Sequence, residues 1–171
     1  MAHIRHEQPA DAKAIFAVHQ AAFATDDEAR LVDALRAAGH ATISLVAELD
    51  GQVVGHVLFS PVSVAGAVEM TKGVGLAPVA VLPSHQRRGI GSALIRAGLA
   101  ACREEGFGYV VLLGHPEYYP RFGFRRASDV GLDNEYGADD AFMVLELMPG
   151  GLPPAGLVQY GPEFRQWERR S

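Results

Sequence analysis

The chain has 171 residues, enough for one domain with a substantial core, and 49% of them are hydrophobic while 20% are charged. Its net charge of −5 argues against general nucleic-acid binding, and the single Cys102 excludes both an internal disulfide framework and a cysteine-based zinc site. No apolar run approaches the ~20 residues of a membrane span and the N-terminus carries no signal-peptide core, so we expect a cytoplasmic protein without a membrane partner.

The first forty residues predict a short strand and two helices. The strand is expected over residues 4–7, and Pro9 suits the first turn of the helix behind it. A second helix is expected to begin at Thr25, because Thr25 and Glu28 form the pattern of a capping box, and to stop at Gly39. Its expected buried stripe consists of Leu31, Ala34, Leu35 and Ala38.

From residue 43 the apolar positions recur with a period of two, which predicts strands. Asp50-Gly51 is a strong signal for a type I′ hairpin turn, so a strand over residues 43–49 should be followed by one over residues 52–64. Residues 68–70 are a candidate extension of this hairpin, and another apolar strand is expected over residues 76–82.

A glycine turn and a long helix follow this strand. The turn carries Gly89 and Gly91, and glycine lets a backbone come close to a ligand. The first N–H groups of the helix have no intrahelical partners and carry partial positive charge. Together with Arg87 and Arg88, they predict an anion site of the kind most often used for phosphate or pyrophosphate. The helix is apolar nearly all round, so we expect it to be largely buried, with Cys102 as a small core residue.

Two familiar glycine-rich phosphate loops do not fit this turn. A nucleotide-triphosphate loop needs Gly-Lys-Ser/Thr, which does not occur in the chain. A dinucleotide fingerprint needs Gly-x-Gly-x-x-Gly/Ala, but Leu94 stands at the last position after Gly89 and Gly91, and Pro78 stands there after Gly73 and Gly75.

The last third predicts shorter elements. Residues 109–113 form a continuous apolar run, as in a strand that is covered on both faces. A brief helical turn is expected over residues 117–122 and strands over residues 142–148 and 157–160, with a flexible joint at residues 150–154.

The run Gln86-Arg87-Arg88-Gly89-Ile90-Gly91 closely resembles the Gln/Arg-x-x-Gly-x-Gly/Ala signature of the GNAT superfamily of N-acetyltransferases. Val79-Ala80-Val81-x-Pro83 and Tyr119-x-x-x-Gly123-Phe124 look like the flanking family features, and the resemblance covers residues 4–148. It implies an α/β (α+β) fold in a single GNAT-like domain, residues 1–149, whose mixed central sheet of about six to seven strands is flanked by helices on both faces. Residues 150–171 would be a C-terminal extension, packed on the domain or at the subunit interface of a homodimer.

The resemblance also implies acetyl-CoA as co-substrate. Backbone N–H groups of the turn would hold its pyrophosphate, and backbone groups of Val79 and Val81 would pair with its pantetheine arm. The sheet would splay between this strand and the one that starts at Tyr109, so that the cofactor enters the gap. The implied cofactor-binding residues are Val79, Ala80, Val81, Gln86, Arg87, Arg88, Gly89, Ile90, Gly91, Ser92 and Tyr119.

The implied reaction is the direct attack of a primary amine on the thioester in a ternary complex. The N–H of Val81 would face the acetyl oxygen, and a donor aimed at the developing oxyanion contributes ~3 kcal/mol. A phenol of pKa ~10 is a suitable proton source for the thiolate, and Tyr119 holds the family's position for it, with Tyr118 as the substitute. The acceptor would be a small molecule or a protein. The alternative is a non-catalytic acyl-CoA-binding regulatory module, and the presence of Tyr119 favours the enzyme.

The sequence offers several candidates for the general base and does not choose among them. His115 follows a strand beside the expected gap, although the family often has a small polar residue there. Glu48, His56 and Glu69 lie on strands that could reach the acceptor side, and no base is needed if the amine arrives neutral. No metal site is expected.

Overall fold

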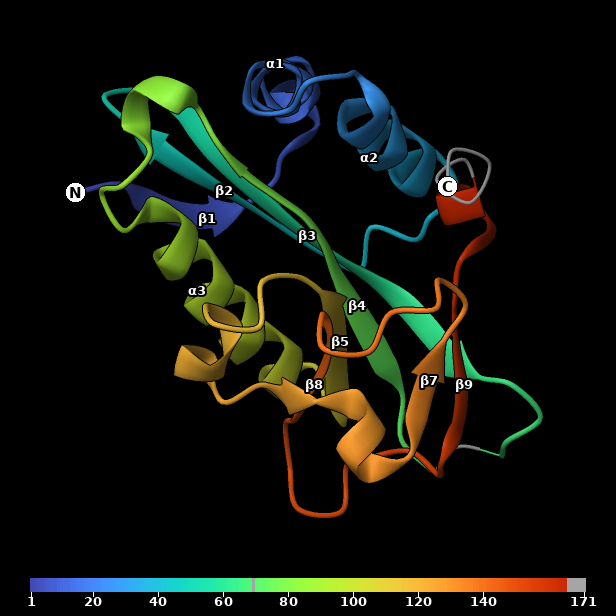
Figure 1. Cartoon of the computed structure of the whole chain (residues 1–171). Helices are drawn as coiled ribbons and strands as arrows, with labels where there is room; N and C mark the ends of the chain where they lie inside the picture. Colours follow the sequence, from blue (N-terminus) through green and yellow to red (C-terminus); the bar gives the residue numbers. More distant parts are fainter. Residues whose placement is uncertain (69, 166–171) are drawn as a thin grey trace. The chain divides into compact units, whose positions relative to one another are not determined.

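Nine strands make up one mixed sheet in the computed structural model, which describes residues 1–68 and 70–165 (Figure 1). They are β1 (His3–His6), β2 (Ile43–Leu49), β3 (Gln52–Val64), β4 (Gly73–Val81), β5 (Tyr109–Leu113), β6 (Arg125–Arg126), β7 (Leu132–Asn134), β8 (Phe142–Glu146) and β9 (Gly156–Tyr160). Hydrogen-bonded neighbours follow the order β1-β2-β3-β4-β5-β8-β6, and β9 pairs with β3 and β7. The predicted mixed sheet is confirmed, but the count of about six to seven strands is wrong, because β6 and β7 are too short to show a period of two.

The chain divides into two compact units. The first consists of Met1–Ser60 and Ala77–Ala101, and the second of Pro61–Leu76 and Cys102–Ser171. None of the helices in the described ranges is long and apolar enough to cross a membrane.

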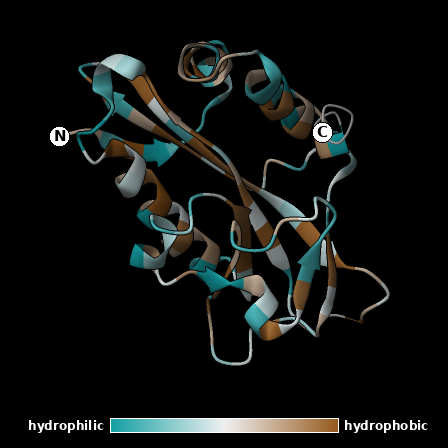
Figure 2. Cartoon of the chain, in the orientation of Figure 1, coloured by the Kyte–Doolittle hydropathy of each residue, from teal (hydrophilic) through white to brown (hydrophobic). Residues whose placement is uncertain are grey.

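In the first unit, helices cover both faces of β3. Figure 1 shows the helices α1 (Ala12–Ala22), α2 (Asp27–Ala37) and α3 (Ile90–Glu104) around the strands. On one face of β3, His56 contacts His19 of α1, and α1 packs against α2. On the other face, a Cβ on Gly98 of α3 would overlap the ring of Phe59. β3 is buried from Val53 to Ser60 and is coloured mostly as hydrophobic over that length in Figure 2. The predicted helices on both faces are therefore confirmed.

The hairpin prediction is also confirmed. β2 and β3 occupy the predicted residues, and the two turn residues both have left-handed φ angles, 52° for Asp50 and 77° for Gly51. Such a turn matches the right-handed twist of the strands that it joins. The extension over residues 68–70 is wrong where it is described: Val68 and Met70 lie outside any strand and are exposed. Glu69 lies outside the described residues.

The start of α2 differs from the prediction. The helix begins at Asp27 with Asp26 at its cap position, and the Thr25 hydroxyl accepts the N–H of Asp27 at 3.3 Å, so no Thr25–Glu28 capping box forms. The helix stops where expected, with a left-handed φ of 76° at Gly39. Its buried residues are Ala29, Leu31, Val32 and Leu35, whereas Ala34 and Ala38 are exposed. On this face Leu31, Val32 and Leu35 remove more apolar surface from water than Ala34 and Ala38 would.

In the second unit, glycines let aromatic rings lie against the backbone of β4. A Cβ on Gly73 would overlap the ring of Tyr109, and one on Gly75 would come within 2.7 Å of the ring of Tyr160. β4 runs parallel to β5, and the register pairs end at Gly75↔Val111, six residues before the end of β4. The strand predicted at 157–160 is present as β9, which adds residues beyond 149 to the sheet.

Candidate functional site

The predicted anion turn lies in the first unit, between the end of β4 and the start of α3. A short 3₁₀ turn, η2 (Pro83–His85), is followed by left-handed φ angles of 63° at Arg87 and 80° at Gly89, and α3 then begins at Ile90. Gln86 Nε2 donates to the carbonyl oxygen of Val81 at 3.0 Å, which ties the turn to β4. The first residue of the signature is therefore a brace that fixes the turn.

Gly91 is the glycine of this turn that the chain itself does not explain. Its φ is not left-handed, and a Cβ would meet only Val81 Cγ2, at 3.8 Å. Every other glycine without a left-handed φ in the described ranges has a neighbour within 3.3 Å of its Cβ position. Because glycine in a helix costs up to ~1 kcal/mol relative to alanine, its presence at the second position of α3 needs another reason. Room for an outside group at the helix N-terminus supplies one.

The turn has an exposed, positively charged side and a buried, apolar side. Arg87 and Arg88 are exposed, whereas Ile90 is buried and its Cγ2 lies 3.3 Å from the Cβ position of Gly55 on β3. The turn thus presents backbone N–H groups and two guanidinium groups to solvent, while Ile90 anchors it to the sheet. An anion with several oxygens fits this arrangement, as at other helix N-termini.

The edge of β4 adds two backbone donors next to the turn. The N–H of Leu82 donates to the carbonyl oxygen of Val54 on β3 at 2.8 Å. Successive N–H groups of a strand point to opposite edges, so those of Val79 and Val81 point away from β3. Ala80, between them, is 5% exposed and points its own N–H toward β3. An extended ligand could therefore add to this edge through the donors at positions 79 and 81.

Tyr119 belongs to the second unit, where it opens the 3₁₀ turn η3 (Tyr119–Phe122). Its ring packs on Gly114, whose Cβ would overlap it, and lies edge-on to the rings of Tyr118 at 5.1 Å and Phe124 at 5.9 Å. Burial, with a smaller contribution from Tyr118, raises the pKa of Tyr119 to about 12. The phenol therefore carries its proton throughout the physiological range, as a proton donor must.

The neighbours of Tyr119 are engaged in different ways. His115 is exposed, and its carbonyl oxygen accepts the N–H groups of Tyr118 at 3.0 Å and Tyr119 at 3.4 Å. The guanidinium of Arg121 lies over the Tyr118 ring at 4.1 Å from its centroid. His115 thus holds the turn through its backbone carbonyl, and its imidazole lies in solvent.

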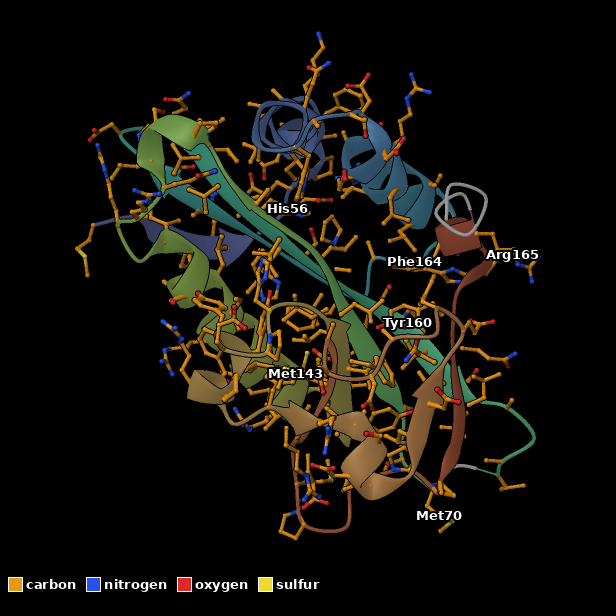
Figure 3. The ribbon with its side chains drawn as sticks, in the orientation of Figure 1. His56, Met70, Met143, Tyr160, Phe164 and Arg165 are labelled. Atoms are coloured by element: carbon orange, nitrogen blue, oxygen red, sulfur yellow. The ribbon has the colours of Figure 1, made fainter. Side chains whose placement is uncertain are left out.

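His56 is not an accessible base but part of a buried polar network in the first unit. His19 Nε2 and His56 Nδ1 are 2.8 Å apart, and His56 Nε2 lies 2.8 Å from Ser44 Oγ (Figure 3 labels His56). Ser44 donates its hydroxyl to Glu7 at 2.7 Å, and Arg36 donates to both oxygens of Glu7 at 2.8 Å. Both ring nitrogens of His56 are therefore occupied by its own chain.

The charge of Glu7 orders this network. Burial alone would raise the pKa of Glu7, but hydrogen bonds from Arg36 and Ser44 outweigh it and lower the pKa. An ionised Glu7 only accepts, so Ser44 donates to it and accepts from His56, which in turn accepts from His19. Burial and the nearby Arg36 lower the pKa of His19 to about 4, and burial lowers that of His56 well below its ordinary value. Both histidines are thus neutral at physiological pH.

The remaining candidate residues belong to an ion-pair cluster or to the core. Glu48 accepts from Arg5 at 2.9 Å, and Arg5 also donates to Asp11, so this carboxylate belongs to a structural ion-pair cluster. Burial raises the pKa of the Cys102 thiol to about 12, consistent with the predicted core residue. Within residues 1–68 and 70–165, no group of three or more His, Cys, Asp or Glu side chains could hold a metal ion.

Sequence reasoning missed the buried network, whose one signal is that His19 falls on the apolar face of its helix.

Comparisons with known proteins agree on one family. A family model for the acetyltransferase (GNAT) domain matches residues 3–127. The chain is 41% identical over 167 residues to the uncharacterized N-acetyltransferase YhbS of Escherichia coli K12, covering 96% of this chain and 99% of the relative. It is 39% identical over 129 residues to the uncharacterized N-acetyltransferase YjhQ of the same organism, covering 74% and 71%.

Two solved structures are similar over almost the whole chain. One is the GNAT family N-acetyltransferase YhbS from Escherichia coli in complex with CoA, with a TM-score of 0.90, 40% identity and coverage of 96% of this chain and 92% of that one. The other is a GNAT family acetyltransferase from Brucella melitensis in complex with acetyl-CoA, with a TM-score of 0.81, 44% identity and coverage of 96% and 98%.

Proposed function

Because the chain belongs to the GNAT family of N-acetyltransferases, we propose that it moves an acetyl group from acetyl-CoA to a primary amine by direct attack in a ternary complex. The observation that carries the proposal is the room at Gly91, beside the N-terminus of α3 and two exposed arginines. The similar structures from Escherichia coli and Brucella melitensis hold CoA and acetyl-CoA, which supports the same ligand here.

Each part of the proposed site has a distinct task. The N–H groups from Gln86 to Ser92, with Arg87 and Arg88, bind the pyrophosphate, since a helix N-terminus favours an anion. The N–H groups of Val79 and Val81, which point away from β3, bind the pantetheine arm, and that of Val81 stabilises the oxyanion. Ala80 and Ile90 contribute backbone between these donors. The cofactor fills space that a side chain longer than that of alanine would otherwise reach from position 91.

The chemistry needs one proton for the departing thiolate and the removal of one proton from the attacking nitrogen. The amine nitrogen forms a bond to the carbonyl carbon, the C–S bond breaks, and Tyr119 gives its proton to the departing thiolate. The phenolate recovers a proton, and the attacking nitrogen loses one, so the products are an amide and free CoA thiol. His115, exposed after β5, is the proposed acceptor of the proton from the amine. The domain boundary at residue 149, the cytoplasmic location and a homodimer stay predictions.

Release of the CoA thiol tests the proposal. Acetyl-CoA is incubated with the full chain and a panel of small amines and lysine-containing peptides, and free thiol is followed by a colorimetric reagent. We expect thiol release with at least one amine and none without an amine. Binding of acetyl-CoA without release on any amine would instead support the non-catalytic acyl-CoA-binding module.

A further inference from the structure

The second unit contains a hollow of about 350 Å³ that has no role in the cofactor site proposed above. Its walls come from the end of β3 with Ser63, from Glu135 and Tyr136 after β7, from Gln159 and Tyr160 of β9, and from Arg165. Figure 3 labels Tyr160 and Arg165, which belong to β9 and the segment that follows it. The volume lies in the range of sites for small molecules.

Contacts within the wall hold its shape. The ring of Tyr160 lies edge-to-face with Tyr136 at 5.8 Å and tilted against Phe164 at 5.0 Å. The N–H of Tyr160 donates to Glu135 Oε1 at 3.2 Å, which fixes the carboxylate at the rim. Burial raises the pKa of Tyr160, so its phenol stays neutral. The aromatic contacts and the bond to Glu135 therefore hold part of the wall, and the polar lining residues Ser63, Glu135, Gln159 and Arg165 are exposed.

Two opposite charges share this hollow. Glu135 and Arg165 both line it, and within residues 1–68 and 70–165 neither forms an ion pair with the other or with another residue. Ser63 and Gln159 add a hydroxyl and an amide that can donate and accept. A ligand that complements these walls carries one ammonium and one carboxylate. A polyamine would meet Arg165 with like charge, and a nucleotide would meet Glu135 in the same way.

We propose that this hollow binds a free α-amino acid, with its ammonium at Glu135 and its carboxylate at Arg165. Charge-assisted hydrogen bonds at both ends give the site its selectivity, because neither half of the ligand satisfies both groups. Binding of the amino acid here does not require the proposed acetyl transfer.

Calorimetric titration of the full chain with the twenty free amino acids tests the site without turnover. The best binder is compared with its carboxamide, which lacks the carboxylate, and with its N-acetyl derivative, which lacks the ammonium. We expect each derivative to bind at least about tenfold more weakly than the free amino acid. Spermidine and inorganic phosphate serve as probes of the opposite preferences, and tighter binding of either one would overturn the proposal.

Variants with matched controls locate the binding site. Glu135→Gln keeps an oxygen for the N–H of Tyr160, so the wall should survive while amino-acid affinity falls about tenfold, and Arg165→Gln should have a similar effect. Glu146→Gln and Arg125→Gln change exposed charges of the same unit outside the hollow and should bind as the unchanged chain does. Unaltered affinity in both Glu135→Gln and Arg165→Gln, at an unchanged Tm, would rule the site out.

The thiol-release assay separates this proposal from the proposed function. Amino-acid binding that depends on Glu135, with no thiol release on any amine, would keep the site and contradict acetyl transfer. Thiol release on an amine, together with unchanged amino-acid affinity in Glu135→Gln, would keep acetyl transfer and contradict the site.

Discussion

Gly91 offers a substitution whose effects on stability and on cofactor binding should have opposite signs. Replacing Gly91 by Glu puts a good helix former and a negative charge in the first turn of α3, next to open space. Relief of the glycine penalty and attraction to the helix N-terminus together stabilise the fold by ~1 kcal/mol. For a chain of this length, that corresponds to a rise in Tm of about 2–4 °C.

The same carboxylate should oppose the pyrophosphate of acetyl-CoA. Two unit charges about 4 Å apart repel each other by ~4 kcal/mol at an effective dielectric constant of ~20, or about a thousandfold in affinity. Solvent and the exposed Arg87 and Arg88 screen part of this repulsion. We therefore expect the Kd for acetyl-CoA to rise at least about a hundredfold.

Calorimetric titration with acetyl-CoA and thermal unfolding measure the two effects on the same protein. Gly91→Ala is the matched control, since it keeps the gain in helix propensity without the charge and the GNAT signature accepts alanine there. It should raise Tm and leave the Kd within about threefold of the unchanged chain. If Gly91→Glu binds acetyl-CoA as tightly as Gly91→Ala, the space at position 91 does not hold the pyrophosphate.

Three further outcomes follow from the two units. Tyr119→Phe should lower kcat by about a hundredfold or more with little change in acetyl-CoA affinity, and an unchanged kcat would remove Tyr119 as the acid. His19 has a pKa of about 4 in the folded chain and an ordinary value near 6.5 when unfolded, so its stabilising contribution is complete above pH ~6.5 and is lost as the pH falls toward ~4, a change of about 3 kcal/mol. Urea unfolding of His19→Gln should accordingly show a shallower loss of stability between pH 7 and pH 5, and identical slopes would contradict this origin. Gly98→Ala should cost about 1–3 kcal/mol because its methyl group overlaps the ring of Phe59, whereas an unchanged Tm would show that the ring can move aside.

Local chemistry explains which elements could be predicted. Asp50-Gly51 determines its own turn, and the run over residues 109–113 is apolar whatever lies around it, so these strands appear at the predicted residues. Thr25 misled because Asp26, one residue later, also suits a cap, and the choice depends on how α2 packs. β6 and β7 form only because longer partners, β8 and β9, are present to pair with them.

The buried network shows a different limit of sequence reasoning. Glu7, Ser44 and His56 are far apart in the chain and meet only after β2 has paired with both β1 and β3. Each residue taken alone reads as a surface polar group, and His56 even reads as a candidate base. Pairing converts that candidate into a satisfied core group, because both ring nitrogens of His56 find partners within the chain, as most buried polar atoms do. The base therefore has to be sought among exposed groups such as His115, not in the interior of the first unit.

Glycine usage connects the fold to the function more directly than any charged residue does. Gly73 and Gly98 lack a Cβ because an aromatic ring occupies that place, and Gly51 and Gly89 adopt φ angles that other residues avoid. These requirements arise inside the chain and would persist in a protein that binds nothing. Gly91 meets neither requirement, and its own helix would be more stable with alanine. A small residue at this position, glycine here and alanine elsewhere in the signature, leaves open space at a helix N-terminus, where an anion binds favourably.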